Sequence, residues 1–473
     1  MYFWINISLF IIYFVIVISC VVVVVSENKN PIRALSWTLA LLFLPVIGVV
    51  FYLFFGRSLK GKAMVSRKVR RKLLERSRPK QHSFERTSLD PEQIRKIKLA
   101  HNLCHAHLDC NNSVEIFTDG RSKFERLKED IRNAKEFIFI QYYIYSDDHI
   151  GNEITSLLAE KVKEGVRVKV LYDHVGSFST RNRFFAAMRS KGIDSHPFFR
   201  VTFRKLANRI NWRNHRKIVV IDGKIGYIGG MNIADRYVEK SSDGRIWRDT
   251  HLRVEGPVIE SMMYSFSVDW NFLRPDADVQ PITTRKCHEA GDVDMQLVTS
   301  GPIDKWNNLV LCFQQAIASA RKRIYIQTPY FLPTDALLKA LQGAALSGVD
   351  VRIMIPEQTD SVLLGYGSRS YIDDCLKAGV KVYLFTPGML HAKTMIIDDD
   401  FVTTGSVNFD FRSFENNFEA NLLIYSDSVN RKMRDIYFQD LSACRKLTLS
   451  GWRSRSRWNR VVESLVRLFA PIL

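Results

Sequence analysis

The chain has 473 residues, a formal net charge of +19 and seven scattered cysteines. The odd cysteine count argues against a disulfide-stapled secreted scaffold and suits a reducing compartment. Residues 57–80 carry a net +10 and residues 445–473 a net +6, so little positive charge is left for the middle. A nucleic-acid enzyme would gather this charge around its site, so we expect no nucleic-acid partner and favour anionic membrane lipids.

Two apolar runs open the chain, at residues 3–25 and 34–55, with a polar turn between them. Each has at least the ~20 residues needed to cross a bilayer. The alternative for the first run is a cleaved signal peptide, but it has no basic leader. We therefore predict a two-helix transmembrane anchor over residues 1–56. The basic residues after the second run favour a cytoplasmic body and an external turn, hence a multi-pass protein of the plasma membrane.

Residues 57–112 are interpreted as a basic cytoplasmic linker whose first half lies on the inner leaflet. Histidines and cysteines crowd together near its end, at His101, Cys104, His105, His107 and Cys110. A zinc site is conceivable, but the spacing matches no common ligand pattern. A polar helix with a buried cysteine face is the preferred interpretation, so no metal and no cofactor is predicted.

From residue 113 the sequence repeats itself. Apolar segments at 137–144 and 165–171 have parallels at 324–331 and 348–354, and amphipathic stretches at 124–134 and 310–320 precede them. The alternation of strand and helix predicts an α/β fold. We expect two similar halves, residues 113–280 and 281–444, each a mixed and largely parallel sheet flanked by helices.

The same polar motif occurs once in each half, as His, one residue, Lys, four residues and Asp, followed ten residues later by Asn. The first copy comprises His215, Lys217, Asp222 and Asn232, and the second comprises His391, Lys393, Asp398 and Asn408. The neighbouring residues are aliphatic and β-branched, so each copy is predicted to be a buried strand with its His and Lys on one face. One copy could arise by chance, whereas two with matching offsets are a strong signal.

These residue types suit phosphodiester chemistry. Two lysines and two asparagines can bind the phosphoryl oxygens, while one imidazole attacks phosphorus and the other protonates the departing oxygen. The lysines supply the positive charge that a metal would otherwise provide. Asp222 and Asp398 fall at the exits of the predicted strands, so we interpret them as acids that fix the turns.

The doubled motif resembles the signature of the phospholipase D superfamily, over roughly residues 113–425. The two-helix anchor and the run Trp247-Arg248-Asp249-Thr250-His251 are similar to those of bacterial cardiolipin synthases. The resemblance implies one active site between the halves, whose catalytic set is the six His, Lys and Asp residues of the motifs. It implies that phosphatidylglycerol is converted into cardiolipin and glycerol through a phosphohistidine. By family analogy alone, His215 is the nucleophile and His391 the acid.

The resemblance also implies a carboxylate partner downstream of each histidine, to fix its tautomer. By offset we assign Asp249 to His215 and Glu419 to His391, with Glu415 as the reserve for the second role. The alternative is that these are surface or turn acids. His251 has no evident counterpart in the second half and is interpreted as structural.

Residues 445–473 form a basic tail. Within it, apolar residues recur at helical spacing between arginines, at Trp458, Val461, Val462, Leu465, Val466 and Phe469. This pattern predicts an amphipathic helix at a membrane interface, favoured also by the nearby Trp452. The alternative is a helix that packs on the core.

Other functions remain open from the sequence. A hydrolytic phospholipase D or a phosphatidylserine synthase would use the same site with water or serine as the acceptor. An anchored nuclease is disfavoured by the position of the charge. A membrane scaffold with an inactive site is disfavoured because all six motif residues are present.

Overall fold

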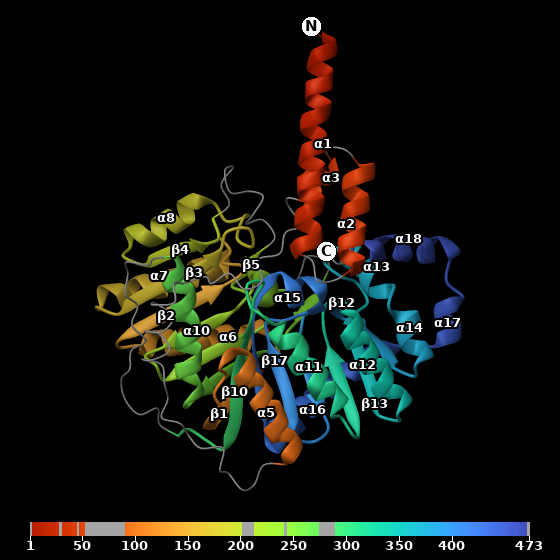
Figure 1. The fold of residues 1–473 in the computed structure, drawn as a ribbon. Coiled ribbons are helices and arrows are strands. Elements are labelled where there is room, and N and C mark those ends of the chain that lie inside the picture. The colour runs from red at the N-terminus through yellow and green to blue at the C-terminus, as the bar shows by residue number, and fades with distance from the viewer. Residues whose placement is uncertain are drawn as a thin grey trace.

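The structure is a computed structural model, and it describes residues 2–27, 31–44, 47–52, 90–200, 212–240, 244–273 and 289–470. Figure 1 shows a large α/β body and a separate group of helices at the N-terminus. The basic segment at residues 57–80 lies outside the described residues.

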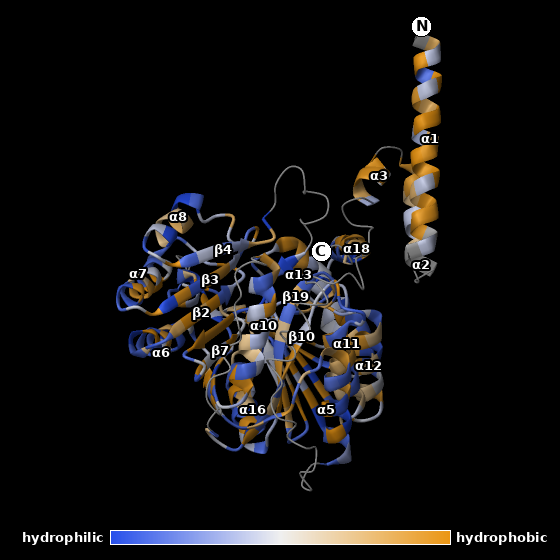
Figure 2. Cartoon of the chain, turned by 60° about the vertical axis from the view of Figure 1, so that its left-hand side comes forward, coloured by the Kyte–Doolittle hydropathy of each residue, from blue (hydrophilic) through white to orange (hydrophobic). Residues whose placement is uncertain are grey.

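The first apolar run forms one long helix, α1 (Tyr2–Glu27). It is long and apolar enough to cross a membrane, and Figure 2 shows its mostly hydrophobic surface. Helix α2 (Pro31–Phe43) packs beside it, and the Tyr13 hydroxyl donates to the Leu41 carbonyl at 3.4 Å. Val17 and Val24 of α1 are buried against this neighbour.

The second apolar run does not form the single spanning helix that we predicted. Helix α2 has 13 residues and is followed by the short helix α3 (Ile47–Phe51). Pro45 stands between them in the sequence, and a proline inside a helix removes a backbone donor. Gly48 lies against α2: a Cβ built on Gly48 would be only 2.4 Å from the backbone oxygen of Ala40. In a straight helix, two residues eight positions apart would be separated by about 12 Å along the axis. Helix α3 therefore folds back on α2, and α1 is the one helix of spanning length among the described residues.

One sheet of 16 strands runs through both halves of the body. The first half contributes β1 (Asp109–Phe117), β2 (Phe137–Tyr142), β3 (Arg167–Asp173), β4 (Asp194–Phe198), the short β5 (Arg213–Asn214), β6 (Ile218–Ile221), β7 (Ile225–Gly229) and β9 (His251–Glu255). The second contributes β10 (Val293–Ser300), β11 (Arg323–Gln327), β13 (Asp350–Pro356), β14 (Lys381–Phe385), β16 (Thr394–Ile397), β17 (Phe401–Gly405), β19 (Asn417–Tyr425) and β20 (Cys444–Lys446). The halves join where β1 pairs with β10.

The sheet is mixed, and its parallel pairs lie away from the seam. Strands β2, β3 and β4 are parallel to one another, as are β11, β13 and β14. The strands between these groups are antiparallel, including both motif strands β6 and β16. The two similar halves and the mixed sheet are confirmed, and the parallel pairing, which we expected to predominate, is confined to these outer groups.

Helices cover both faces of the sheet (Figure 1). One face carries α5 (Pro91–Cys104), α6 (Gly120–Asn133), α7 (His149–Lys163), α8 (Asn182–Ser190), α11 (Asn308–Ala318), α12 (Asp335–Leu346) and α14 (Ile372–Lys377). The other carries α10 (Val258–Leu273) and α16 (Asp427–Ser442). Phe266 of α10 and Met433 of α16 belong to one apolar core that crosses the seam. This shared core fixes the two halves to each other.

The motif aspartates accept hydrogen bonds from the backbone where β2 and β11 begin. Asp222 has a left-handed φ of 53°, and its carboxylate accepts the backbone N–H groups of residues 135–137 at 2.7–2.8 Å. Asp398 has a φ of 49° and accepts those of residues 321–323 at 2.7–3.0 Å. The prediction that these acids fix turns is confirmed.

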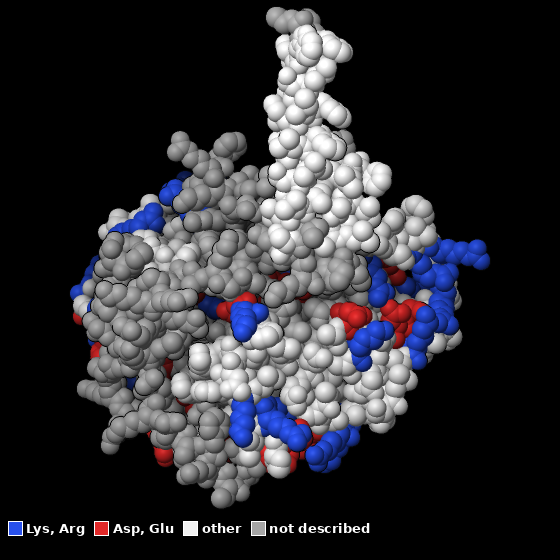
Figure 3. Space-filling view, in the orientation of Figure 1, with Lys and Arg blue, Asp and Glu red and all other residues white. Residues whose placement is uncertain are grey.

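The tail forms α17 (Leu449–Arg453) and the amphipathic α18 (Arg457–Leu468). One side of α18, including Glu463 and Val466, is buried, and this helix packs against α13 (Val362–Arg369). The other side exposes apolar residues, at Trp458, Val461, Leu465, Leu468 and Phe469. Figure 3 shows basic side chains gathered over α17 and α18. Trp452, which we had placed at the membrane interface, is instead buried beneath the guanidinium of Arg455.

Candidate active site

Each motif histidine is delivered to the seam by a short strand that pairs with the opposite half. Strand β5 (Arg213–Asn214) pairs in parallel with β19, and β15 (Gly388–Leu390) pairs in parallel with β8 (Ile246–Arg248). The backbone N–H of His215 then donates to the Phe418 carbonyl at 2.9 Å, and that of His391 donates to the Arg248 carbonyl at 2.7 Å. Both histidines are therefore anchored to the half that they do not belong to.

The His-x-Lys segments are not within the buried strands, contrary to our prediction. Strand β6 begins at Ile218 and β16 at Thr394, so His and Lys precede the ladder in both copies. In each copy the strand before the histidine pairs with a strand of the opposite half, and the strand after the lysine pairs with strands of its own half. Each lysine ammonium donates to the carbonyl of its own histidine, Lys217 at 2.7 Å and Lys393 at 2.6 Å. A local bend therefore turns each lysine back toward its own histidine, and the Lys393 ammonium also lies 3.0 Å from Nδ1 and 3.3 Å from Nε2 of His391.

The carboxylate partners are exchanged relative to our assignment. Nδ1 of His215 donates to Glu419, whose two carboxylate oxygens both lie at 3.0 Å, and Nδ1 of His391 donates to Asp249 at 2.6 Å. The pairing of Asp249 with His215, and of Glu419 with His391, was wrong. The pairing of β5 with β19 explains the exchange. The backbone N–H of His215 is hydrogen-bonded to the Phe418 carbonyl, and Glu419 is the next residue along β19. Glu419 fills the role for which Glu415 was the reserve.

The two carboxylates are held differently. Glu419 also accepts hydrogen bonds from the Ser406 hydroxyl at 2.5 Å and the Asn417 amide at 3.1 Å. Asp249 accepts its second bond from the backbone N–H of Thr250 at 2.7 Å. Gly230 stands where the second half has Ser406, and a Cβ there would lie 2.1 Å from the Asp249 carboxylate. The carboxylate of Asp249, on its shorter side chain, therefore lies in space that a side chain at position 230 would fill, and Gly230 leaves that space open.

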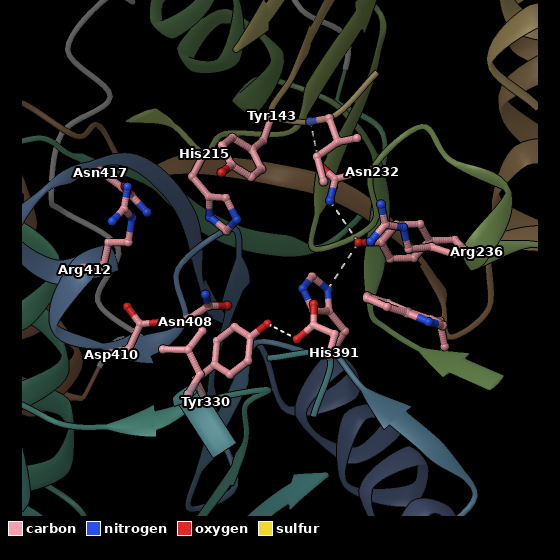
Figure 4. A pocket seen from close by; sticks show the side chains of 15 residues that line it. Tyr143, His215, Asn232, Arg236, Tyr330, His391, Asn408, Asp410, Arg412 and Asn417 are labelled. Atoms are coloured by element: carbon pink, nitrogen blue, oxygen red, sulfur yellow. Dashed lines mark hydrogen bonds between the residues drawn. The ribbon is translucent and has the colours of Figure 1, made fainter. Parts of the chain in front are cut away.

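The two imidazoles face a cavity of ≈ 330 Å³ at the seam (Figure 4). His215 is 8% exposed and His391 7%. The cavity is lined by residues of both halves: Tyr143, Ile144, His215, Asn232, Arg236, Tyr237, Trp247, Tyr330, Asp360, Leu364, His391, Asn408, Asp410, Arg412 and Asn417. Of the residues predicted for the site, both histidines and both asparagines line the cavity. The two lysines do not line it but bond to the carbonyls of their own histidines, and Asp222 and Asp398 face their turns.

Burial controls the protonation of the site. It lowers the pKa of both imidazoles to about 4, against the pull of their carboxylate partners. Burial likewise lowers the pKa of Lys393, and that of Lys217 lies well below its usual range. At neutral pH each imidazole is therefore uncharged. Since Nδ1 carries the proton donated to a carboxylate, Nε2 keeps its lone pair.

The charges around the histidines are unequal. Burial lowers the pKa of His215, Glu419 raises it, and Lys217 and Lys393 lower it. The pKa of His391 is lowered by burial and Lys393, but Asp249 and Asp360 both raise it. The pKa of both imidazoles is nevertheless lowered to about 4, and the Lys393 ammonium lies 3.0 Å from Nδ1 of His391.

Several lining residues were not found from the sequence. The Tyr237 hydroxyl lies 3.5 Å from Nδ1 of His391 and accepts the amide of Asn232 at 2.9 Å. The Trp247 ring centre lies 5.3 Å from that of His391. Arg236 and Arg412 each come four residues after a motif asparagine, so the repeat could have shown them.

His251 does have a positional counterpart. It pairs with Gly229 in the way that Asn421 pairs with Gly405. The His251 side chain is fully buried, and burial holds its pKa well below the usual range. It lies one residue beyond Thr250 on β9 and does not line the cavity.

Comparison with known proteins identifies the family. Residues 127–267 and 313–441 match the family described as "Cardiolipin synthase, PLD-like domain", and residues 10–57 match "Phospholipase_D-nuclease N-terminal". The chain is 39% identical over 469 residues to the "Major cardiolipin synthase ClsA" of Bacillus subtilis, covering 97% of both chains. It is 37% identical to a cardiolipin synthase of Listeria monocytogenes, covering 96% of both.

Among solved structures, phosphatidylserine synthase from Haemophilus influenzae shares the fold. The TM-score is 0.59 at 16% identity, over 80% of this chain and 98% of that one. The full-length match to cardiolipin synthases, together with two phospholipase D-like halves around one paired-histidine cavity, settles the family. The chain belongs to the cardiolipin synthase family of phospholipase D-like phosphatidyltransferases.

Proposed function

We propose that this enzyme joins two phosphatidylglycerol molecules into cardiolipin and glycerol, with His215 as the nucleophile. The observation that carries the proposal is the pair of buried imidazoles on one cavity, each fixed at Nδ1 by a carboxylate of the other half. This arrangement leaves Nε2 of His215 available to attack phosphorus, while Nε2 of His391, 3.3 Å from the Lys393 ammonium, can carry the proton of the leaving group.

In the first step, Nε2 of His215 attacks the phosphorus of the donor lipid. The bond from phosphorus to glycerol breaks, and His391 gives its proton to the glycerol oxygen. The anionic phosphodiester favours a charged imidazole, so substrate binding supplies the condition for protonating one histidine. Lys217 and Lys393 stabilise the charge on the phosphoryl oxygens, together with Asn232 and Asn408 on the cavity wall.

In the second step, His391 takes the proton of the acceptor's hydroxyl group. The acceptor oxygen forms a bond to phosphorus while the phosphorus–nitrogen bond to His215 breaks. One phosphodiester replaces another, so no nucleotide is consumed. Glu419 and Asp249 keep the two imidazoles in the required tautomer throughout.

The carboxylates that act on His391 support this assignment of roles. An acid must begin protonated, and Asp249 and Asp360 both raise the pKa of His391. A nucleophile must begin neutral, and Lys217 and Lys393 both lower the pKa of His215.

We also propose that the enzyme is a multi-pass protein of the bacterial plasma membrane with a cytoplasmic body. Helix α1 would cross the bilayer, and the second apolar run would return through it only once α3 extends from its folded-back position on α2. The exposed apolar side of α18, flanked by Arg457 and Arg460, would lie on anionic lipid. The basic sequence at residues 57–80 supports the same orientation. No part of this scheme requires nucleic acid.

The decisive experiment gives purified enzyme phosphatidylglycerol alone and identifies the products. Cardiolipin and glycerol in equal amounts are expected. Phosphatidic acid as the main product would indicate a hydrolase. Phosphatidylserine formed only when serine is added would indicate a serine acceptor.

A further inference from the structure

The proposed reaction brings two phosphates to one cavity. One is the reacting phosphate between the histidines. The other belongs to the acceptor phosphatidylglycerol, is separated from the attacking hydroxyl by the glycerol carbons, and does not react. A site that prefers this acceptor to water or glycerol should offer a cation for the second phosphate, on the side where the acceptor enters.

Two arginines of the cavity wall occupy matching positions in the repeat. Arg236 comes four residues after Asn232, and Arg412 four residues after Asn408. Within the described part of the chain, neither guanidinium makes a hydrogen bond or an ion pair. Figure 4 shows them on opposite sides of the two histidines. The internal repeat has therefore placed one arginine on each side of the reaction centre.

Arg236 belongs to the side of His391. Its guanidinium carbon lies 5.2 Å from the centre of the Trp247 ring, and that ring is 5.3 Å from the imidazole of His391. Tyr237 packs against both rings, at 5.3 Å and 5.9 Å between centres. Since His391 protonates the departing glycerol and deprotonates the acceptor, Arg236 lies where the acceptor's headgroup must pass. Arg236 is also exposed, so lipid arriving from the membrane can reach it.

Arg412 belongs to the other side. Its charge acts on Tyr143, whose ring lies 4.9 Å from the imidazole of His215. This is the side of the phosphatidyl group that becomes attached to His215. Arg412 therefore serves as a matched control, with the same residue type, the same place in the repeat and the same cavity.

We propose that Arg236, held over Trp247, binds the non-reacting phosphate of the acceptor lipid and so selects an anionic phosphodiester alcohol as the acceptor. The inference rests on the proposed function. It explains how the phosphohistidine is kept for a second lipid in a site that water can also enter. The acceptor's hydroxyl still loses its proton to His391 as its oxygen replaces His215 on phosphorus.

The test measures how the phosphohistidine partitions between acceptors. Full-length enzyme in detergent micelles receives phosphatidylglycerol with ethanol as a competing neutral alcohol, and cardiolipin, phosphatidylethanol and phosphatidic acid are quantified. In Arg236→Gln the ratio of cardiolipin to the other two products should fall about tenfold, the loss expected for one charge-assisted contact. Arg236→Lys should restore part of the ratio. Arg412→Gln should lower total turnover and leave the ratio near that of the wild type.

The outcomes separate the two proposals. An unchanged ratio in a folded Arg236→Gln enzyme, or an equal fall in Arg412→Gln, would overturn the acceptor site. A wild-type enzyme that makes no cardiolipin from phosphatidylglycerol would instead overturn the proposed function. Thermal unfolding of each variant shows whether it is folded, and the ratio is independent of how much enzyme is active.

Discussion

Glu419 fixes the imidazole of His215 although the two residues are 204 positions apart and belong to different halves. The reciprocal contact joins Asp249 to His391 over 142 positions. Neither half by itself contains a histidine with its carboxylate. The active site is therefore complete only when the halves are joined, and the apolar core shared by α10 and α16 supports that joining.

The exchanged carboxylates predict different defects in the two reaction steps. Glu419→Gln should slow attack by His215 by about 10²–10⁴-fold, because the wrong tautomer is then favoured. A p-nitrophenyl phosphodiester, whose leaving group needs no proton, should not rescue this variant. The same substrate should largely rescue the first step of Asp249→Asn. Release of p-nitrophenol, followed in the burst phase, measures that step. Rescue of Glu419→Gln instead would contradict the roles that we assign.

The covalent intermediate should be found on His215. In His391→Ala the first step with the activated phosphodiester should proceed, while the second stalls for lack of a base. A phosphoryl adduct should then accumulate, stable to base and labile to acid, and mass spectrometry of a digest would locate it. His215→Ala should give no adduct. An adduct on His391 in the His215→Ala protein would reverse the roles and leave the reaction class intact.

The lowered imidazole pKa predicts the pH dependence of the first step. Attack requires neutral His215, whose pKa burial lowers to about 4. In His391→Ala with the activated substrate, the rate of adduct formation should be flat from pH 8 to about pH 5. It should then fall with an apparent pKa near 4 as His215 gains a proton. A midpoint near 6.5, the value of an exposed histidine, would show that burial does not act in this way.

Protonation should also couple to stability. The unfolded chain binds a proton at each histidine below about pH 6.5, whereas the folded chain does so only near pH 4. Both histidines therefore contribute stability above pH 6.5 that is lost as the pH falls from 6.5 towards 4. The thermal midpoint of His215→Ala should accordingly decline less over this window than that of the wild type, when each is measured in the same detergent.

The motif aspartates should act on stability and not on chemistry. Asp222→Ala removes the acceptor of three backbone N–H groups and a residue that tolerates a positive φ. Folding should weaken by about 1–3 kcal/mol, seen as a lower thermal midpoint. The enzyme that remains folded should retain its rate of adduct formation. Asp222→Asn keeps a side-chain oxygen and should be milder. A large loss of that rate without loss of stability would place Asp222 in the reaction.

Cysteine labelling tests the membrane arrangement. A cysteine at Lys62 should be protected from an impermeant thiol reagent in intact cells, and one at Asn28 should react. Protection at both positions would mean that the segment with α2 and α3 dips into the bilayer and leaves on the same side. Reaction at Lys62 would place the body outside. Labelling after membrane permeabilisation controls for access in every case.

The sequence by itself determined the chemistry. The doubled motif identified the histidines and lysines, the offsets located both asparagines on the cavity, and the strand-end positions of Asp222 and Asp398 indicated their bracing role. These inferences succeed because a local pattern fixes them, through the residue spacing within each motif copy and the geometry of the turn that follows its strand.

Only the tertiary structure decided the partners. Sequence order placed Asp249 with His215, but β5 pairs with β19 across the seam and brings Glu419 there instead. Helix α3 folds back on α2, although the hydropathy of residues 34–55 predicts one continuous spanning helix. Arg236 lies on the His391 side of the cavity because it stacks on Trp247, whose ring packs near that imidazole. Each of these outcomes depends on contacts between distant segments, and a local pattern carries no information about which distant segments meet.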